Sequence, residues 1–142
     1  MASLRSTRIT AKRVQKVFYS DFDRDFDLNP ITGALEVLVN DKSIQQSIEN
    51  LVLTQRGERF YHLQVGSDVQ KSLFDNFDDL TAVNIQNSIK QTINQYEPRA
   101  TNVQIALAPT TDFNGYLVNI TFTPINIPTQ TQTFDLLIPR IR

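Results

Sequence analysis

Few residues of this 142-residue chain have the types and spacing that chemistry at an active site requires. Glu58 and Glu97 could act on a glycosidic bond as general acid and nucleophile or base, if the fold brought them close together. Arg59 follows Glu58, however, and Arg99 lies two residues after Glu97. A neighbouring guanidinium lowers the pKa of a carboxyl group, whereas a glycosidase acid needs a raised pKa. We therefore expect a structural use of both glutamates, with a small lysozyme-like peptidoglycan hydrolase as the alternative.

The expected structural use is an ion-pair network. Arg56 and Arg59 can offer two-pronged hydrogen bonds to Glu97, which sits in the stretch INQYEPRA at residues 93–100. Such a network would hold the loop at 55–66 against the end of a helix expected over 82–96. Whether Arg99 turns inward to this network or outward to a neighbouring subunit is open.

Metal and cofactor chemistry finds little support in the sequence. His62 is the only histidine and there is no cysteine, so a zinc site would need carboxylates at no recognisable spacing. The aspartate-rich stretch DFDRDFDLN at residues 21–29 fails as an EF-hand loop, because Phe26 and Thr32 stand where glycine and glutamate are required. We expect a solvated acidic edge there, and no cofactor.

The charge of the chain is distributed unevenly. The net charge is −1, but the first twenty residues hold five cations and no acid, which leaves −6 for the other 122. The cations are Arg5, Arg8, Lys12, Arg13 and Lys16. We interpret residues 1–20 as an extended basic arm that docks onto an acidic partner protein, with a disordered tail as the alternative. The rest of the chain has no basic face for nucleic acid and no apolar run of membrane-spanning length.

Periodic patterns predict the elements that position these residues. Alternating Leu35, Val37 and Val39 predict a strand over 34–40. Asp41 can cap a helix over 42–54, and Gly57 lies beyond its end. The apolar stripe of this helix has helical spacing and consists of Ile44, Ile48, Leu51 and Val52.

A second helix is predicted over 82–96, with Thr81 as its cap and Pro98 ending it at Glu97. Its stripe is Ala82, Ile85, Ile89, Ile93 and Tyr96. After Arg99 the period changes to two in three runs: Val103 to Leu107, Tyr116 to Phe122 and Phe134 to Ile138. Asn114–Gly115 signals a hairpin between the first two runs.

Together these elements predict an α+β fold. Two helices pack on a small antiparallel or mixed sheet, made of a C-terminal three-stranded meander plus the early strand. The extended basic arm at 1–20 precedes a single domain at 21–142.

The order of several short motifs resembles one known family. QRGERF at 55–60, Gly66, LF at 73–74 and YEPR at 96–99 are similar to the baseplate wedge or sheath-initiator proteins of contractile phage tails and related contractile injection systems, a GPW-type lysozyme-like domain family. The likeness covers about residues 26–107. Family members often have a proline-rich stretch where this chain has FYHLQVG, and the basic arm has no match.

The resemblance implies a structural virion protein of the tail baseplate, synthesised in the host cytoplasm. It would be the platform that initiates sheath assembly, with other wedge proteins, sheath subunits and tube or hub proteins as partners, in several symmetry-related copies, about six. The residues expected to lock its central loop and partner surface are Arg56, Gly57, Glu58, Arg59, Glu97, Pro98 and Arg99. Residues 129–142, ending their pairing at Pro139, would add as a strand to a neighbour or form an ordinary strand of this domain.

Overall fold

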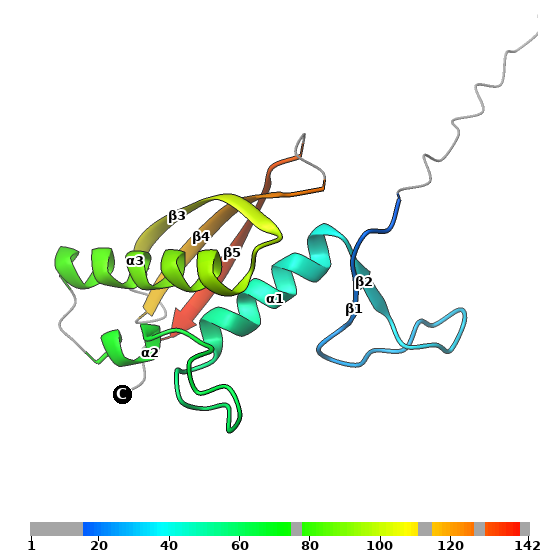
Figure 1. Cartoon of the computed structure of the whole chain (residues 1–142), viewed down its shortest axis with the longest axis horizontal. Coiled ribbons are helices and arrows are strands. Elements are labelled where there is room, and N and C mark those ends of the chain that lie inside the picture. Colours follow the sequence, from blue (N-terminus) through cyan, green and yellow to red (C-terminus); the bar gives the residue numbers. More distant parts are fainter. Residues whose placement is uncertain (1–15, 75–77, 111–114, 127–129, 140–142) are drawn as a thin grey trace, which may run out of the picture.

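The computed structural model describes residues 16–74, 78–110, 115–126 and 130–139 (Figure 1). The elements in chain order are β1 (Ser20–Phe22), β2 (Val37–Val39), α1 (Asp41–Leu53), α2 (Val69–Ser72), α3 (Asp79–Tyr96), β3 (Ala100–Thr110), β4 (Gly115–Pro124) and β5 (Gln132–Pro139). The predicted α+β class is therefore confirmed.

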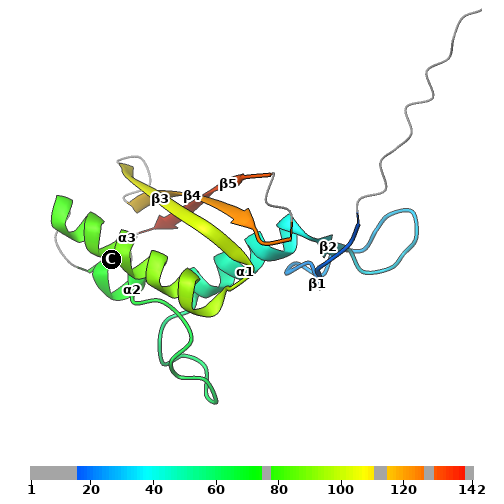
Figure 2. The ribbon, with the colours of Figure 1, turned by 45° about the horizontal axis from the view of Figure 1, so that its top comes forward.

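The C-terminal sheet is an antiparallel meander in the order β3-β4-β5. Its register pairs Ile105 with Ile120, and Ile120 with Phe134. Because side chains alternate across a strand, these three lie on the same face, and the helices cover that face (Figure 2). The three alternating runs seen in the sequence are thus the three strands.

The core lies between this sheet face and the two long helices. Ile85, Ile89 and Ile93 recur every four residues along α3 and are fully buried. The stripe of α1 is buried as predicted, and its isoleucines join the same apolar cluster as the inward residues of β4. Burying such side chains contributes roughly 1.5–3 kcal/mol each, so this cluster is the main stabilising element.

Both helix starts differ from the prediction. The carboxylate of Asp78, and not the hydroxyl of Thr81, caps α3, and it accepts the Thr81 N–H at 2.8 Å. In α1 the helix already includes Asp41, and Asn40 is the N-cap residue. The end of α3 is as predicted, because Pro98 disfavours helical geometry at Glu97 and the helix stops at Tyr96.

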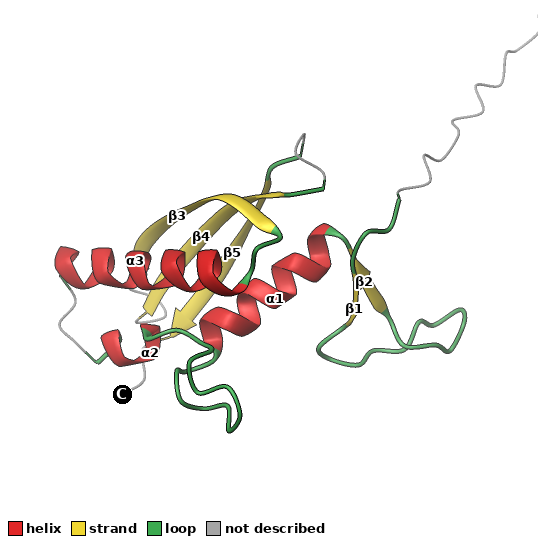
Figure 3. Ribbon diagram, viewed as in Figure 1, coloured by secondary structure: helices red, strands yellow, loops and turns green. Residues whose placement is uncertain are grey.

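The early strand is correct, but it does not join the meander. β2 pairs antiparallel with β1 in a second sheet of two strands, within residues 20–39, which we call the N-terminal hairpin. Figure 3 shows the N-terminal hairpin projecting beyond the start of α1, away from the meander. The sequence patterns missed β1 and the short α2. Of the predicted arm, residues 1–15 lie outside the described part of the chain, as does Asn114 of the hairpin signal.

Candidate functional site

Glu97 lies at the junction where α3 ends and β3 begins, and its carboxylate is the centre of a buried polar cluster. The residue is 2% exposed. Arg99 donates from Nε to Oε1 at 2.6 Å and from Nη2 to Oε2 at 2.7 Å. The hydroxyl of Ser47, in the middle of α1, donates to Oε2 at 2.5 Å. The Glu-Pro-Arg triplet therefore bonds to itself across its proline and to the first long helix.

Arg99 turns inward, which answers the question that the sequence left open. Its guanidinium also lies over the ring of Tyr19, 5.2 Å from the ring centroid, in a cation–π contact. Tyr19 immediately precedes β1, and its hydroxyl accepts a hydrogen bond from the Asn126 side chain, just after β4. The cluster thus joins the lead-in to the N-terminal hairpin, α1, the end of α3 and the sheet.

The electrostatics of the pair keep Glu97 ionised. Burial alone would raise the pKa of this carboxyl, but the hydrogen bonds and charge of Arg99, with the Ser47 hydroxyl, outweigh burial and hold its pKa below the ordinary value. The hydrogen bonds that Arg99 donates to Glu97 in turn raise the pKa of Arg99. A carboxylate that is paired and ionised at neutral pH is suited to structural use and unsuited to donating a proton.

The expected ion pairs from Arg56 and Arg59 to Glu97 are wrong. Arg56 pairs instead with Asp68, which follows the loop in sequence, and Nη1 lies 3.1 Å from Oδ2. Arg59 is exposed and forms no ion pair with any residue that the structure describes. Arg99 already bonds to both carboxylate oxygens of Glu97. The arginine nearest in sequence therefore makes the ion pair that was expected from Arg56 and Arg59.

The Arg-Gly-Glu-Arg loop (residues 55–66) instead uses its motif to fold upon itself. Gly57 adopts a φ of +94° and donates its N–H to the Leu63 carbonyl at 2.8 Å. The Glu58 carboxylate accepts the Gln55 N–H at 3.0 Å. Because Glu58 is exposed and bonded within its own turn, this glutamate contributes to loop geometry and not to the cluster around Glu97.

The loop is nevertheless held against α3, through hydrogen bonds that the sequence did not predict. The hydroxyl of Tyr96 donates to the Gln64 carbonyl at 2.6 Å, and the Thr92 hydroxyl reaches the Gly66 carbonyl at 3.4 Å. Gly66 has a φ of +128°, and a Cβ there would meet the Thr54 carbonyl oxygen at 2.6 Å. The close approach of two backbone segments therefore requires glycine at this position.

The tip of the same loop exposes two aromatic rings that the sequence analysis had not counted as functional. Phe60 is 93% exposed and Tyr61 is 96% exposed, beside a half-exposed Leu63. Residues 60–65 and Tyr96 line a shallow depression there. Apolar side chains gathered on an ordered loop are typical of a protein contact. The sequence signal was available, because three of the five residues after Arg59 are large and apolar or aromatic.

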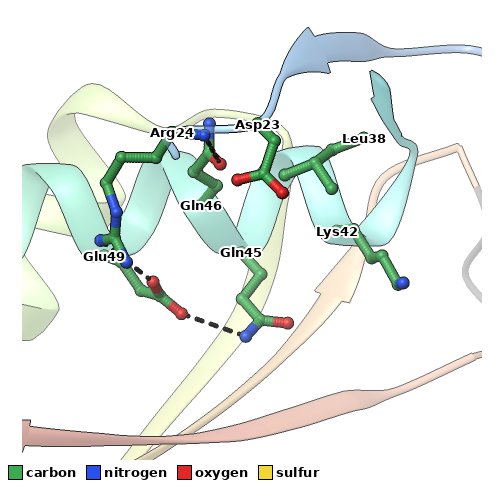
Figure 4. A pocket seen from close by; sticks show the side chains of 7 residues that line it. All are labelled: Asp23, Arg24, Leu38, Lys42, Gln45, Gln46 and Glu49. Carbon is green, nitrogen blue, oxygen red and sulfur yellow. Dashed lines mark hydrogen bonds and ion pairs between the residues drawn. The ribbon is translucent and has the colours of Figure 1, made fainter. Parts of the chain in front are cut away.

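A small groove of about 250 Å³ separates the N-terminal hairpin from α1 (Figure 4). Gln46 of α1 bridges the two, donating to the Phe22 carbonyl at 2.8 Å and accepting the Arg24 N–H at 3.0 Å. Arg24 also pairs with Glu49 at 3.7 Å. Neither Glu58 nor Glu97 lines this groove, so it does not serve the two-carboxylate chemistry.

The described residues include no group of three or more potential ligands placed to hold a metal ion.

Asn40 fastens the chain ahead of the N-terminal hairpin, a role that sequence reasoning missed. It is almost fully buried with a φ of +52°. Its Oδ1 accepts from the N–H groups of Phe18 and Tyr19, at 2.8 and 3.3 Å, and its Nδ2 donates to the Lys16 carbonyl at 2.9 Å. An asparagine directly before a predicted helix start was the available signal, because asparagine tolerates positive φ better than most residues.

No helix in the described ranges has the length and apolar character needed to cross a bilayer.

Comparison with known proteins adds a family and several relatives. The family model described as "Baseplate wedge protein gp25" matches residues 39–123. The baseplate wedge protein gp25 of Enterobacteria phage T4 is 26% identical over 121 residues, which cover 83% of this chain and 89% of that protein.

Three solved structures are similar in fold. A putative tail lysozyme from Geobacter sulfurreducens has a TM-score of 0.69 at 20% identity, over 75% of this chain and 97% of that one. A chain of the anti-feeding prophage baseplate has a TM-score of 0.59 at 19% identity, over 87% of each chain. A chain of the type VI secretion system baseplate complex has a TM-score of 0.55 at 13% identity, over 68% of this chain and 91% of that one.

Proposed function

The chain belongs to the baseplate wedge protein gp25 family of contractile tails, and from that membership we propose that it is the baseplate subunit on which the tail sheath begins to assemble. It acts as a template and not as a catalyst. Its partners are other wedge proteins, sheath subunits and the tube or hub proteins, around which several copies are arranged in the particle. Its place is therefore the virion tail.

The observation that carries the proposal is the half-covered meander. The helices lie on one face of the sheet, and no described strand pairs with the outer edge of β5. The other face carries an exposed cross-strand apolar pair, Leu117 opposite Leu137. An edge strand offers unpaired backbone groups to which an incoming strand can bond, and alternating side chains then set its register.

β5 itself is an ordinary strand of this domain, since Gln132–Pro139 pairs with β4 along its whole length. Residues 129–142 were interpreted either as a strand added to a neighbour or as an ordinary strand of this domain. For the described residues, the structure supports the second interpretation. In our proposal the segment receives a strand at its outer edge and is not itself donated.

The hydrolase alternative has no support from the geometry of its two carboxylates. Glu97 has a lowered pKa and no free oxygen, and Glu58 is exposed within a separate turn. The similarity to a putative tail lysozyme is at 20% identity and shows a shared fold. We therefore assign the Glu-Pro-Arg cluster to holding the template surface in shape.

Site-specific cross-linking in assembling particles tests the proposal. The chain has no cysteine, so Leu137→Cys places one thiol on the exposed face of β5. We expect a cross-link to a sheath subunit. The matched control is Asn87→Cys, on the exposed face of α3, which we expect to give none.

A genetic test asks whether the subunit is needed at all. In tails that lack this protein, we expect straight tubes without an ordered sheath, seen by electron microscopy. Normal sheaths on such tubes would overturn the initiation role. A cross-link from Asn87→Cys, with none from Leu137→Cys, would instead move the template surface from the sheet to α3.

A further inference from the structure

The N-terminal hairpin has an apolar face that the described residues leave exposed. Phe22 and Val37 face each other across the two strands, and an isolated bridge pairs Leu28 with Leu35 farther along. Phe22 is 56% exposed, Val37 48% and Leu28 63%. Two strands alone are marginally stable in water, and a third strand is a common remedy.

One edge of this small sheet is already occupied. The outward carbonyl of Phe22 accepts a hydrogen bond from the Gln46 side chain, which also accepts the Arg24 N–H. The amide of Gln46 thus bonds to the outer edge of β1 much as a neighbouring strand would. An additional strand has no place on that side.

The other edge is free. Two backbone hydrogen bonds flank the pairing of β1 with β2: Asn40 N–H to Tyr19 O at 2.8 Å, and Asp23 N–H to Glu36 O at 3.2 Å. Antiparallel pairs alternate between bonded and non-bonded, so Val37 and Val39 direct their N–H and C=O groups away from β1. Within the described ranges no group bonds to them. β2 therefore presents an open edge.

The charge of the N-terminal hairpin indicates what fits this edge. Residues 20–39 carry five acids and one cation, a net charge of −4, and the cation, Arg24, is already paired with Glu49. Residues 1–16 carry five cations and no acid. Opposite charges of similar size on two segments of one chain favour their association, most strongly at low salt.

Residues 7–12, TRITAK, also have the pattern of a strand. In extended geometry Arg8, Thr10 and Lys12 would share one side, and Thr7, Ile9 and Ala11 the other. Beside β2, the basic side matches the face that carries Glu36, and Ile9 matches the apolar face that carries Val37. Threonine and isoleucine favour strands.

The direction of the chain places this strand on a different copy. The side chain of Asn40 holds Lys16 and Phe18 extended past the base of the N-terminal hairpin, away from its turn. Residues 7–16 contain no Gly, Pro, Asn, Asp or Ser, the residues that usually reverse a chain. The extended chain from Lys16 back to residues 12 and 7 spans about 13 and 30 Å, so the second copy must lie next to the first. We propose that residues 7–12 of one copy add as a third strand to the open edge of β2 in a second copy.

The proposal rests on the proposed function in one respect, that copies lie side by side in the particle. It is tested with the isolated full-length chain, so the two can fail separately. We expect light scattering and sedimentation to show self-association that rises with protein concentration and falls with salt. In the same samples, hydrogen exchange at the Val37 and Val39 amides slows as the protein associates, whereas the Leu38 amide, bonded within the N-terminal hairpin, does not change.

Charge reversal identifies the two partners. Arg8→Glu with Lys12→Glu, or Glu36→Lys alone, should each weaken association about tenfold, because attraction across exposed pairs becomes repulsion. When the two variants are mixed, we expect association to return. The reversed arm of one variant then has a charge opposite to that of the Glu36→Lys edge of the other. Failure of this rescue would overturn the proposal.

A proline scan tests the edge itself. Val37→Pro removes an outward N–H without disturbing the pairing of β2 with β1, and should abolish association with the fold intact. The matched control, Ser20→Pro, acts on the opposite edge and should leave association unchanged. A wild-type chain that stays monomeric overturns the proposal. The proposal is also overturned if slow hydrogen exchange at the Val37 amide depends on the arm charges but not on protein concentration. The arm would then bind to its own copy.

Discussion

At the scale of single residues, the Glu97–Arg99 pair is the polar contact on which the junction depends. Replacing Glu97 with Gln leaves Arg99, only 30% exposed, without its counter-charge. We expect a loss of about 2 kcal/mol in the free energy of unfolding, less than for a fully buried pair because water partly screens Arg99. Urea unfolding at neutral pH measures it. Glu58→Gln is the matched control and should change stability little, because that carboxylate is exposed and a glutamine oxygen can still accept the Gln55 N–H.

The same residue predicts a pH dependence. The pKa of Glu97 in the folded chain lies below its ordinary value of 4.5, so the folded state favours the charged form. Its contribution to stability is complete above pH 4.5 and is lost as the pH falls through the lower, folded-state pKa. The stability difference between wild type and Glu97→Gln should therefore stay constant from pH 7 to about 5 and shrink below. A difference that grows on acidification would contradict this assignment.

The chemical character of this cluster could be predicted from the sequence, but its partners could not. The arginine two residues from Glu97 was enough to predict a lowered pKa and a structural role. Nothing in the spacing shows that Ser47, fifty residues earlier, comes within hydrogen-bond distance, or that Arg56 prefers Asp68. Ion-pair partners are chosen by the path of the backbone in space, which local patterns do not encode.

At the scale of elements, the two glycines of the Arg-Gly-Glu-Arg loop should respond differently to substitution. Both have positive φ, but a Cβ at Gly66 meets the Thr54 carbonyl while one at Gly57 has open space. We expect Gly66→Ala to cost about 3 kcal/mol and Gly57→Ala about 1 kcal/mol, from backbone strain with and without a clash. Thermal or urea unfolding of the two variants measures both. Equal costs would show that strain alone matters.

The attachment of the N-terminal hairpin should depend on the Asn40 side chain. Asn40→Gly keeps the positive φ without strain and removes three hydrogen bonds. We expect the Phe18 and Tyr19 amides to exchange at least about fivefold faster, with one hydrogen bond counted at about 1 kcal/mol. Amides in the middle of α3 should exchange as in wild type. If they also accelerate, the Asn40 contacts stabilise the whole domain and not one attachment.

Long periodic elements were predictable and short or boundary features were not. The isoleucine stripes of α1 and α3 and the alternation of three strands have enough repeats to identify them. β1 has three residues and α2 has four, too few for a period to show. Both caps lie N-terminal to the predicted cap, because Asp78, Thr81, Asn40 and Asp41 are all good capping residues and tertiary contacts choose among them.

At the scale of the whole molecule, the basic arm should be separable from the fold. The described apolar core lies between Ile44 and Ile138. At protein concentrations where the full chain is monomeric, a chain lacking residues 1–15 should therefore unfold at the same temperature as the full chain, measured by circular dichroism. It should fail to enter assembling baseplates if the arm is a docking segment. A lower melting temperature would mean that the arm packs on the domain.

The position of Tyr19 has a mechanical consequence in a machine that contracts. Tension on the arm passes through residues 16–19 before it reaches the rest of the chain. There the Asn40 side chain accepts from the Phe18 and Tyr19 N–H groups, the guanidinium of Arg99 lies over the Tyr19 ring, and the side chain of Asn126 donates to the Tyr19 hydroxyl. Because these contacts act in parallel on the same segment, they share the pulling force between α1, the start of β3 and the end of β4. A pull on one terminus is thereby spread over the body of the subunit and does not peel it open one bond at a time.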